Sequence, residues 1–539
     1  MRHLGRQILL NNIAVGAMHN SKERYDAPRC HEDTRKAVLK DISSWISDMT
    51  KDSLILWLSA PAGSGKSAIL QKIAEEFGDS DRLAASFFFS RTAAKRNTEN
   101  HLISTIAYQL ATSIPAARRY IEEAVDHDPS IFGRTLQVQL EGLIIQPLVH
   151  ASLDPQGGAH WPTLLVIDGL DECNGKESQV SILNAFKDAL LKLSASLPVL
   201  YLLIASRPET AIRQSFEHDL TAITHHISLD NSYDPDRDIA VFLRSSFSDI
   251  LRRGRTQFSS MMTLPQSWPS DDVTSFLVEK SSGQFIFAAT VIRFIGIDRR
   301  IPTAQLAIIM NICQSTGSTR FATNPFALLD QVYSFVLQSV EETEKVLSVL
   351  GVIVHLNGDQ DHTPDLIASL LDCDSEELTL LFWDLHSIVD VPKSSSSVIR
   401  FYHASFRDYL VNPYRSNELH VQEFEAHSLL CEGCLRTLSK WPPTITATDV
   451  HPGVHEPAVR YSSEQWAYHY TCGDNISVGA LDGILSKFDP SVCLGLSDSV
   501  TRLQLIAWWD RFASARRRWH LRVKLFFSCM TSLTLIPLH

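Results

Sequence analysis

The sequence lacks the excess of basic residues by which proteins hold nucleic acids. Its formal net charge is −12, whereas neutralisation of phosphates by Lys and Arg supplies most non-specific nucleic-acid affinity. A short basic run between Arg511 and Lys524 is a local exception, and we interpret it as a solvated helix face. The sequence therefore predicts no nucleic-acid partner.

Long apolar runs and cysteines are also scarce. A membrane-spanning helix needs roughly 18 or more apolar residues in succession, and the closest stretch, residues 525–538, is shorter and contains Ser, Thr and Pro. The first 20 residues lack the unbroken apolar segment of a secretory signal. Nine cysteines in 539 residues favour a reducing compartment. We therefore expect a cytoplasmic protein with no membrane span.

Strand patterns alternate with helical patterns in the first half of the chain. Strands are predicted at 54–59, 84–89, 163–168, 199–206 and 223–229, the last of them at an edge. Helices are predicted at 35–45, 102–111 and 181–193. Continuous apolar strands between helices indicate an α/β fold with a parallel sheet that is covered on both faces.

Beyond about residue 234 the strand signal fades and helical periodicity dominates. We predict a lead-in, a P-loop NTPase domain, a helical domain, a winged-helix-like domain with a short β pattern at 397–402, and a helical C-terminal region whose last part is divergent. The predicted ranges are 1–29, 30–233, 234–341, 342–415 and 416–539.

The most informative string is APAGSGKS at residues 60–67. It matches the phosphate-binding pattern GxxxxGK[ST], except that Ala60 replaces the first glycine, which is tolerable if that position needs no positive φ. Glycines let the backbone curl so that several N–H groups point at one phosphate, and the helix that follows presents its positive end to the same anion. The predicted nucleotide-binding residues are Ala62, Gly63, Ser64, Gly65, Lys66, Ser67 and Ala68.

A second string, LLVIDGLDE at residues 164–172, ends an apolar strand in a carboxylate. In P-loop NTPases this position holds Mg²⁺ together with the loop hydroxyl, so Ser67 and Asp168 are the predicted metal ligands. Glu172 is the predicted base that orients the attacking water, with Asp171 in support. The long separation between the loop and Asp168 leaves room for two further strand–helix units, which disfavours small nucleotide kinases.

A third strand ends at Arg207, on the edge of the sheet where we expect the other two motifs. An arginine there can stabilise the outer phosphate, and we predict this catalytic role for Arg207. A surface ion pair with a carboxylate is the alternative interpretation. Arg91, which follows the strand at 84–89, is a weaker candidate of the same kind.

These strings, WLSAPAGSGKSAILQKIAEEF, LLVIDGLDEC and LLIASRPE, resemble the NACHT branch of the STAND NTPases. The similarity is greatest to fungal NLR-like proteins with a nephrocystin-3-like N-terminal NTPase domain, and it extends over about residues 20–470. The resemblance implies ATP, ADP and Mg²⁺ as ligands and a closed resting state with ADP. It also implies that His403 of a winged helix touches the ADP phosphate and that Arg35 lies near the nucleotide.

The function that we expect is a slow ATPase acting as a nucleotide-dependent conformational switch. Its NLR-like relatives suggest protein partners or a homo-oligomer on activation, and a link to self/non-self recognition. The N-terminal effector domain and C-terminal repeats of many relatives are not recognisable here, and residues 514–539 do not resemble the family. The alternatives are a nucleotide-binding scaffold without turnover, a conventional P-loop ATPase, and an inactive, degenerate product.

Overall fold

A computed structural model describes residues 4–473, apart from gaps at 25–26, 49, 92, 154–160, 196–199, 230, 316–325, 358–361, 393, 396 and 441–455. Residues 474–539, which include the predicted divergent end at 514–539 and the basic run, lie outside the described residues. Two compact units are present. The first contains residues 1–332 with 403–405, and the second contains 333–402 with 406–539. The predicted domain ranges divide the chain more finely and stay predictions.

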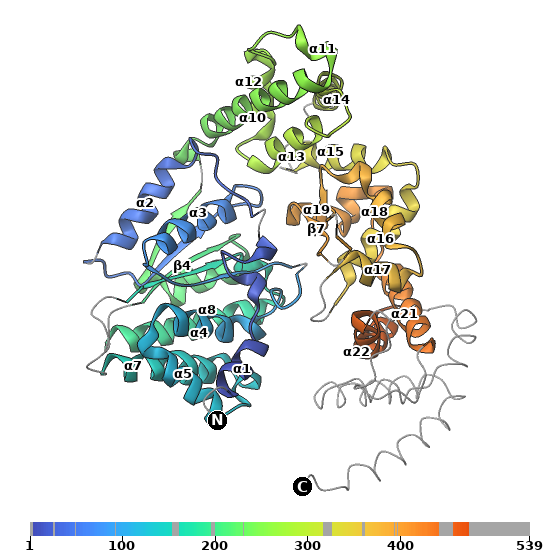
Figure 1. Cartoon of the computed structure of the whole chain (residues 1–539). Coiled ribbons are helices and arrows are strands. Elements are labelled where there is room, and N and C mark those ends of the chain that lie inside the picture. The colour runs from blue at the N-terminus through green and yellow to red at the C-terminus, as the bar shows by residue number, and fades with distance from the viewer. Residues whose placement is uncertain are drawn as a thin grey trace. The chain divides into compact units, whose positions relative to one another are not determined.

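A five-stranded parallel sheet forms the centre of the first unit (Figure 1). Its strand order is β2-β3-β4-β1-β5. The strands are β1 (Ile55–Ser59), β2 (Leu83–Phe88), β3 (Leu164–Asp168), β4 (Tyr201–Ser206) and β5 (Thr224–Ser228). Each overlaps a strand predicted from the sequence. The α/β fold with a parallel sheet is therefore confirmed.

Burial explains why four of these strands are mostly apolar. Every residue of β1, β2, β3 and β4 is buried, as expected for parallel strands with helices on both faces. Only Ile227 is buried in β5, which pairs with β1 alone and forms one edge of the sheet. The edge position predicted for 223–229 is therefore confirmed.

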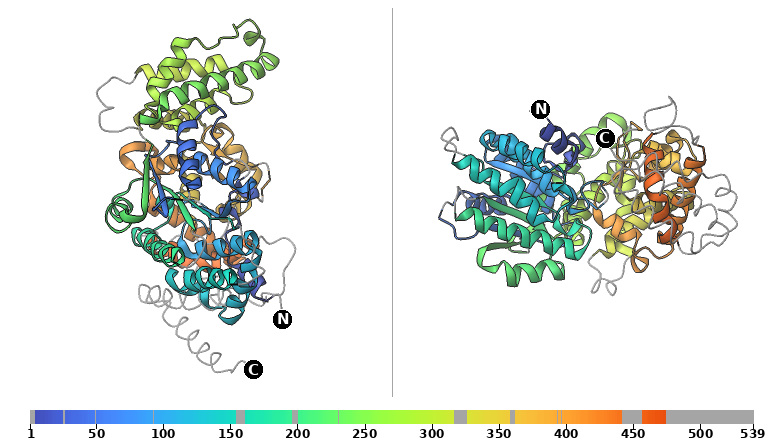
Figure 2. Two further views of the ribbon diagram at one scale, coloured as in Figure 1. Left: turned by 90° about the vertical axis from the view of Figure 1, so that its left-hand side faces the viewer. Right: turned by 90° about the horizontal axis from the view of Figure 1, so that it is seen from below.

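Helices cover both faces of this sheet (Figures 1 and 2). Helix α3 packs against β2, β3 and β4, and α4 packs against β2. The helices of the α/β part are α1 (Leu4–Asn11), α2 (Lys36–Ser47), α3 (Lys66–Asp79), α4 (Leu102–Ser113), α5 (Pro115–His127), α6 (Leu136–Leu140), α7 (Gln146–Ser152), α8 (Lys176–Ser194) and α9 (Thr210–Gln214). The predicted lead-in also joins this core, because Leu9 and Ile13 are buried within it.

A run of helices completes the first unit. They are α10 (Pro235–Gln257), α11 (Ser259–Met262), α12 (Asp271–Ser281), α13 (Phe285–Ile295), α14 (Pro302–Ser315) and α15 (Ala327–Gln338), the last of which crosses into the second unit. Local sequence sets two of their starts. The Asp234 side chain caps α10 ahead of Pro235, and Ser270 caps α12.

The second unit is mostly helical. Its elements are α16 (Thr343–His355), α17 (Pro364–Leu371), α18 (Ser375–Leu381), β6 (Val389–Asp390), β7 (Arg400–Phe401), α19 (Ala404–Leu410), α20 (Pro413–Ser416), α21 (Glu423–Ser439) and α22 (Glu456–Cys472). Strands β6 and β7 pair antiparallel, and β7 falls within the predicted β pattern at 397–402. None of the helices in the described part of the chain has the length and apolarity that crossing a bilayer requires.

The central position of β4 generates a prediction about stability. Leu203 of β4 is fully buried, whereas Leu191 of α8 is 42% exposed. Leu203→Ala should lower the free energy of unfolding by about 2–5 kcal/mol because it leaves a cavity in the core. Leu191→Ala, the matched control, should change it by less than about 0.5 kcal/mol. Urea denaturation followed by circular dichroism measures both, and equal effects would contradict the described packing.

Candidate functional site

The loop between β1 and α3 has the backbone that its glycines predict. Gly63 has φ of 77° and Gly65 has φ of 93°, a left-handed conformation that residues with a Cβ rarely adopt. Ala60 does not adopt a positive φ, and its N–H donates to the Ser206 carbonyl at 3.3 Å. The alanine in place of the first glycine is thus compatible with the loop, as predicted. A curled loop that leads into a helix N-terminus is suited to binding an anion.

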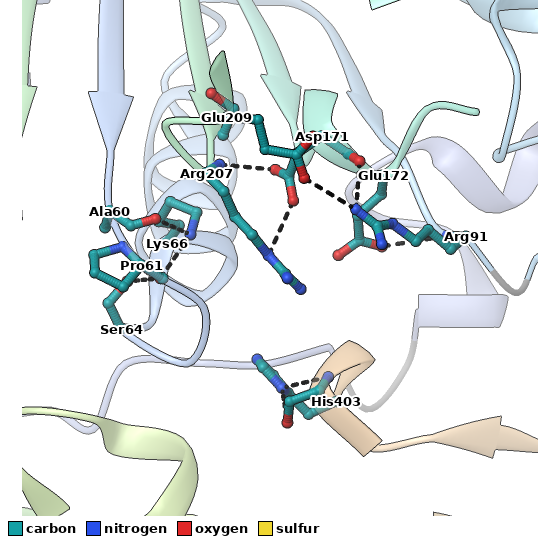
Figure 3. A network of polar contacts seen from close by, with 12 residues as sticks. Ala60, Pro61, Ser64, Lys66, Arg91, Asp171, Glu172, Arg207, Glu209 and His403 are labelled. Atoms are coloured by element: carbon teal, nitrogen blue, oxygen red, sulfur yellow. Dashed lines mark hydrogen bonds and ion pairs between the residues drawn. The ribbon is translucent and has the colours of Figure 1, made fainter. Parts of the chain in front are cut away.

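Lys66 is the first residue of α3 and folds back over the loop (Figure 3). Its Nζ donates to the carbonyl oxygens of Ala60 at 2.8 Å and Pro61 at 3.0 Å. Burial lowers the pKa of Lys66, while the negative charge of Asp171 acts in the opposite direction. An additional anion beside Lys66 would therefore stabilise its charged form.

Asp168 is the last residue of β3, and one of its two carboxylate oxygens has no hydrogen-bond partner among the described residues. The residue is 4% exposed, and its buried Oδ1 has no hydrogen-bond partner among the described residues. Burial raises the pKa of Asp168, and the neighbouring Ser67 hydroxyl opposes that shift. An orphaned buried carboxylate oxygen beside a hydroxyl fits a hard cation such as Mg²⁺, which prefers oxygen ligands.

Asp171 and Arg207 join the ends of two neighbouring strands. Asp171 lies in a short turn after β3, and Arg207 directly follows β4. The Arg207 backbone N–H donates to Asp171 Oδ1 at 2.9 Å, and Arg207 Nε lies 3.1 Å from Oδ2. The ion pair that the sequence offered as an alternative for Arg207 is thus present. Its partner, however, is another predicted site residue rather than an unrelated surface carboxylate.

Glu172 lies beside the same group of charges. Its Oε2 accepts a hydrogen bond from the Arg91 backbone N–H at 3.3 Å, and Arg91 Nη2 donates to the Asp171 carbonyl at 2.8 Å. Burial, together with the charges of Asp171 and Asp168, raises the pKa of Glu172 to about 7 against the opposing effect of Arg207 and Arg91. A carboxyl group with a pKa near neutrality is suited to general-base chemistry.

Arg35 contacts the loop itself. Its Nη2 donates to the Ser64 carbonyl at 2.6 Å, and its guanidinium carbon lies 4.6 Å from the centre of the Phe285 ring. Its backbone N–H donates to Asp238 Oδ2 at 2.9 Å. Arg35 thereby connects the loop to α10, which carries Asp238, and to α13, which begins at Phe285.

A second connection runs directly from the loop to α13. The Ile286 N–H donates to the Gly63 carbonyl at 3.2 Å. A Cβ at Gly63 would lie 2.2 Å from Ile286 Cγ2, which is closer than side chains approach one another. Glycine at this position is therefore required both by its positive φ and by the close approach of α13.

The structure thus brings most predicted site residues to one edge of the sheet. Lys66 lies near enough to Asp168, Asp171, Glu172 and Arg207 for all four charges to affect its pKa. His403 is separate in sequence, but residues 403–405 group with the first unit. Its Nδ1 accepts a hydrogen bond from the Ser405 backbone N–H at 3.1 Å, near the start of α19, as a helix-capping side chain does.

Sequence reasoning offered Arg91 only as a weaker candidate and did not find the loop's partners on the helices. Arg91 follows a strand end, which was a usable signal. Asp238, Phe285 and Ile286 lie far from the loop in sequence, and their residue types carry no local signal for this contact.

Comparison with known proteins gives one partial match. Residues 33–207 match the protein family described as Nephrocystin 3, N-terminal. No curated protein matches the chain. The matched range includes the loop, the end of β3 and Arg207, so it supports the nephrocystin-3-like part of the resemblance and is compatible with an NTPase-like domain.

The Asp171–Arg207 pair generates a second prediction about stability. The Asp171 side chain is 3% exposed and that of Arg207 is 20% exposed. Asp171→Asn should lower the free energy of unfolding by about 2–4 kcal/mol, because it leaves a poorly solvated guanidinium without its counter-charge.

Glu217→Gln provides the matched control, because it removes an ion pair with Arg213 in which both side chains are more than half exposed. This variant should differ from the wild type by less than about 0.5 kcal/mol. Denaturant titration measures both variants. Equal stability of Asp171→Asn and the wild type would show that the pair does not hold the two strand ends together.

Proposed function

We propose that this chain is an ATP- and ADP-binding NTPase of the NACHT type, in which the bound nucleotide sets the conformation. The observation that carries the proposal is the convergence of a glycine-shaped loop, Lys66 and the orphaned Asp168 carboxylate at one edge of a parallel sheet. Ligands of open parallel α/β sheets bind at this edge. The family match over residues 33–207 supports the same assignment.

The loop would hold the phosphates. Backbone N–H groups of residues 62–68 surround the anion, and the start of α3 adds its positive potential. Lys66 exchanges its two carbonyl partners for the outer phosphates. Burial lowers the pKa of Lys66 because the charged amine has lost water. A bound phosphate would stabilise that charge in place of the lost water.

Ser67 and Asp168 would hold Mg²⁺, which supplies positive charge to the phosphate oxygens when bound. The Oδ1 atom of Asp168 gains the partner that it lacks among the described residues. The Ser67 hydroxyl already lies beside this carboxylate and lowers its pKa. No large rearrangement of β3 is needed for these two side chains to act together.

Glu172 would accept a proton from the attacking water. Its raised pKa, about 7, lets it take up a proton at neutral pH. Arg207 would stabilise the charge of the transferred phosphoryl group, but its guanidinium is held by Asp171 in this structure. If Arg207 had to turn toward the phosphoryl group, this ion pair would have to open first, which would slow the hydrolysis that we propose.

The contacts of the loop with α10 and α13 would make binding a conformational signal. Gly63 and Ser64 belong to the phosphate loop, and their carbonyl oxygens accept hydrogen bonds from Ile286 and Arg35. A shift of the loop on exchange of ADP for ATP therefore changes contacts with both helices. A full reversal from 1:99 to 99:1 needs about 5.5 kcal/mol of differential binding.

In the proposed resting state His403, on a winged-helix-like domain, contacts the phosphate of ADP, and ATP releases that contact. The activated protein would meet protein partners or further copies of itself in the cytoplasm, as NLR-like proteins do.

A scaffold that binds nucleotide without turnover is the second candidate. It is favoured by the engagement of both arginines, because Arg207 is paired with Asp171 and Arg91 is bound to Asp171, Glu172 and Glu209. A conventional ATPase acting on nucleic acid is less well supported, since the net charge is −12.

Lys66→Ala tests nucleotide binding. The variant should lose about 100-fold in affinity for ADP and ATP, because a charged hydrogen-bond donor to phosphate is removed. Lys72→Ala, an exposed residue on the same helix, is the matched control and should bind normally. Fluorescent-nucleotide titration gives the affinities. Mass spectrometry of nucleotide released from freshly purified, denatured protein should find ADP in the wild type and control only.

Normal nucleotide affinity of Lys66→Ala would contradict the assignment of Lys66 and its loop to phosphate binding. An absence of ADP from the purified wild type would argue against the closed resting state, while leaving the binding site itself intact.

Glu172→Gln tests hydrolysis. Phosphate release should fall by about 100-fold or more, whereas ATP affinity should be kept. In the wild type kcat/KM should rise with pH and level off above about 7, because the base acts only when it is deprotonated and burial raises its pKa to about 7. Glu177→Gln, an exposed residue at the start of α8, is the control. Equal phosphate release by both variants would favour the scaffold.

A further inference from the structure

The second unit contains a cluster of histidines where three helices meet. His355 is the last residue of α16, His427 lies in α21 and His469 lies in α22. His427 and His469 are 2% and 0% exposed. The nitrogens of buried imidazole rings need hydrogen-bond partners, because burying an unpaired polar atom lowers the stability of the fold.

Hydrogen bonds account for two of these rings. Nδ1 of His427 lies 2.7 Å from Nδ1 of His469, and Nε2 of His469 lies 2.7 Å from the Tyr461 hydroxyl. Nε2 of His355, by contrast, is buried and has no hydrogen-bond partner among the described residues. These hydrogen bonds use Nδ1 of His427, so its Nε2 can contact a different neighbour.

That neighbour is a carboxylate. Glu423 precedes His427 by one helical turn, and its Oε1 lies 3.8 Å from His427 Nε2. One ligand atom each of His355, Glu423 and His427 lie within 4.8 Å of one another. Ligands on a zinc ion lie about 2.0–2.2 Å from the metal, so roughly 3.4 Å apart in a tetrahedral site. A bound ion would therefore have to draw the three atoms closer together, through rotation of their side chains.

We propose that His355, Glu423 and His427 bind a divalent transition-metal ion, zinc in the first place, which joins α16 to α21. Two imidazole nitrogens and a carboxylate oxygen form a ligand set that zinc accepts readily. The metal gives the buried His355 nitrogen the partner that it lacks. Glu423, whose side chain is 72% exposed, leaves the site open to solvent, and water takes the fourth position.

The surroundings of the three ligands support a metal rather than a chance cluster. A metal-bound histidine is usually oriented by a hydrogen bond from its second nitrogen, and His427 has that bond to His469. His469 is fixed in turn by Tyr461, whose hydroxyl also accepts from the Asn357 N–H at 3.2 Å. The α21 thiols are poorer candidates, because burial raises the pKa of Cys434 to about 12 and disfavours its thiolate.

Zinc binding by the full-length chain tests the proposal. Protein stripped with a chelator is kept in excess Mg²⁺ and ATP, so that the nucleotide site takes no part, and is titrated with Zn²⁺ against a chromophoric chelator. One zinc per chain should bind. Glu423→Gln should weaken binding by at least about 10-fold and His355→Gln by more. Glu425→Gln, exposed on the same helix and outside the cluster, is the matched control and should bind like the wild type.

Substitution with Co²⁺ identifies the ligands. The visible bands of a nitrogen- and oxygen-ligated ion should form in the wild type and in Glu425→Gln, and should be lost in Glu423→Gln. Thiolate charge-transfer absorption would assign the metal to cysteines and overturn the proposal. So would the absence of stoichiometric zinc, or unchanged binding in Glu423→Gln. Because Glu423 is exposed, this variant decides the matter even if circular dichroism shows that His355→Gln fails to fold.

Discussion

Mutual repulsion among three carboxylates is the constraint on which the candidate site depends. Asp168, Asp171 and Glu172 lie at the end of one strand in a poorly solvated space, where burial raises the pKa of Asp168 and of Glu172 and the charge of Asp171 raises both further. Arg207 stabilises Asp171, and Arg91 approaches Glu172 through its backbone. Asp168 keeps one oxygen without a partner among the described residues. The remaining negative charge is what a bound cation would balance.

The backbone of the phosphate loop connects the site to the helices beyond the sheet. A loop that holds phosphates must keep its N–H groups turned inward, so its carbonyl oxygens point elsewhere. Gly63 and Ser64 use theirs to accept hydrogen bonds from Ile286 and Arg35. Anything that reshapes the inner side of the loop therefore acts on α10 and α13. These contacts would be the physical basis of the switch that we propose.

The second unit also contains buried polar atoms that lack partners among the described residues. Histidines at the junction of α16, α21 and α22 place polar rings in an apolar interior, and the chain of hydrogen bonds ending at Tyr461 satisfies only part of them. A metal held by His355, Glu423 and His427 would complete this arrangement. The two sites would then use different ions, since oxygen ligands suit Mg²⁺ and imidazoles suit zinc.

The order of residues was enough to predict the sheet and the residues that end its strands. Buried parallel strands must be apolar throughout, so β1, β3 and β4 were visible as runs that stop at polar residues. Carboxyl ends of parallel strands share one edge, and this brought Lys66, Asp168 and Arg207 together in the prediction. The positive φ of Gly63 and Gly65 likewise followed from the residue type.

Which of these groups contact one another could be learned only from the folded chain. The pairing of Arg207 with Asp171, the approach of Arg91 to Glu172 and the contact of Arg35 with Ser64 depend on side-chain packing, which no periodicity encodes. The histidine cluster was invisible for the same reason. Glu423 and His427 share a helix face, but their meeting with His355 depends on how α16 packs against α21. Local sequence fixes an element and its faces, whereas contacts between distant segments follow from the packing of the whole unit.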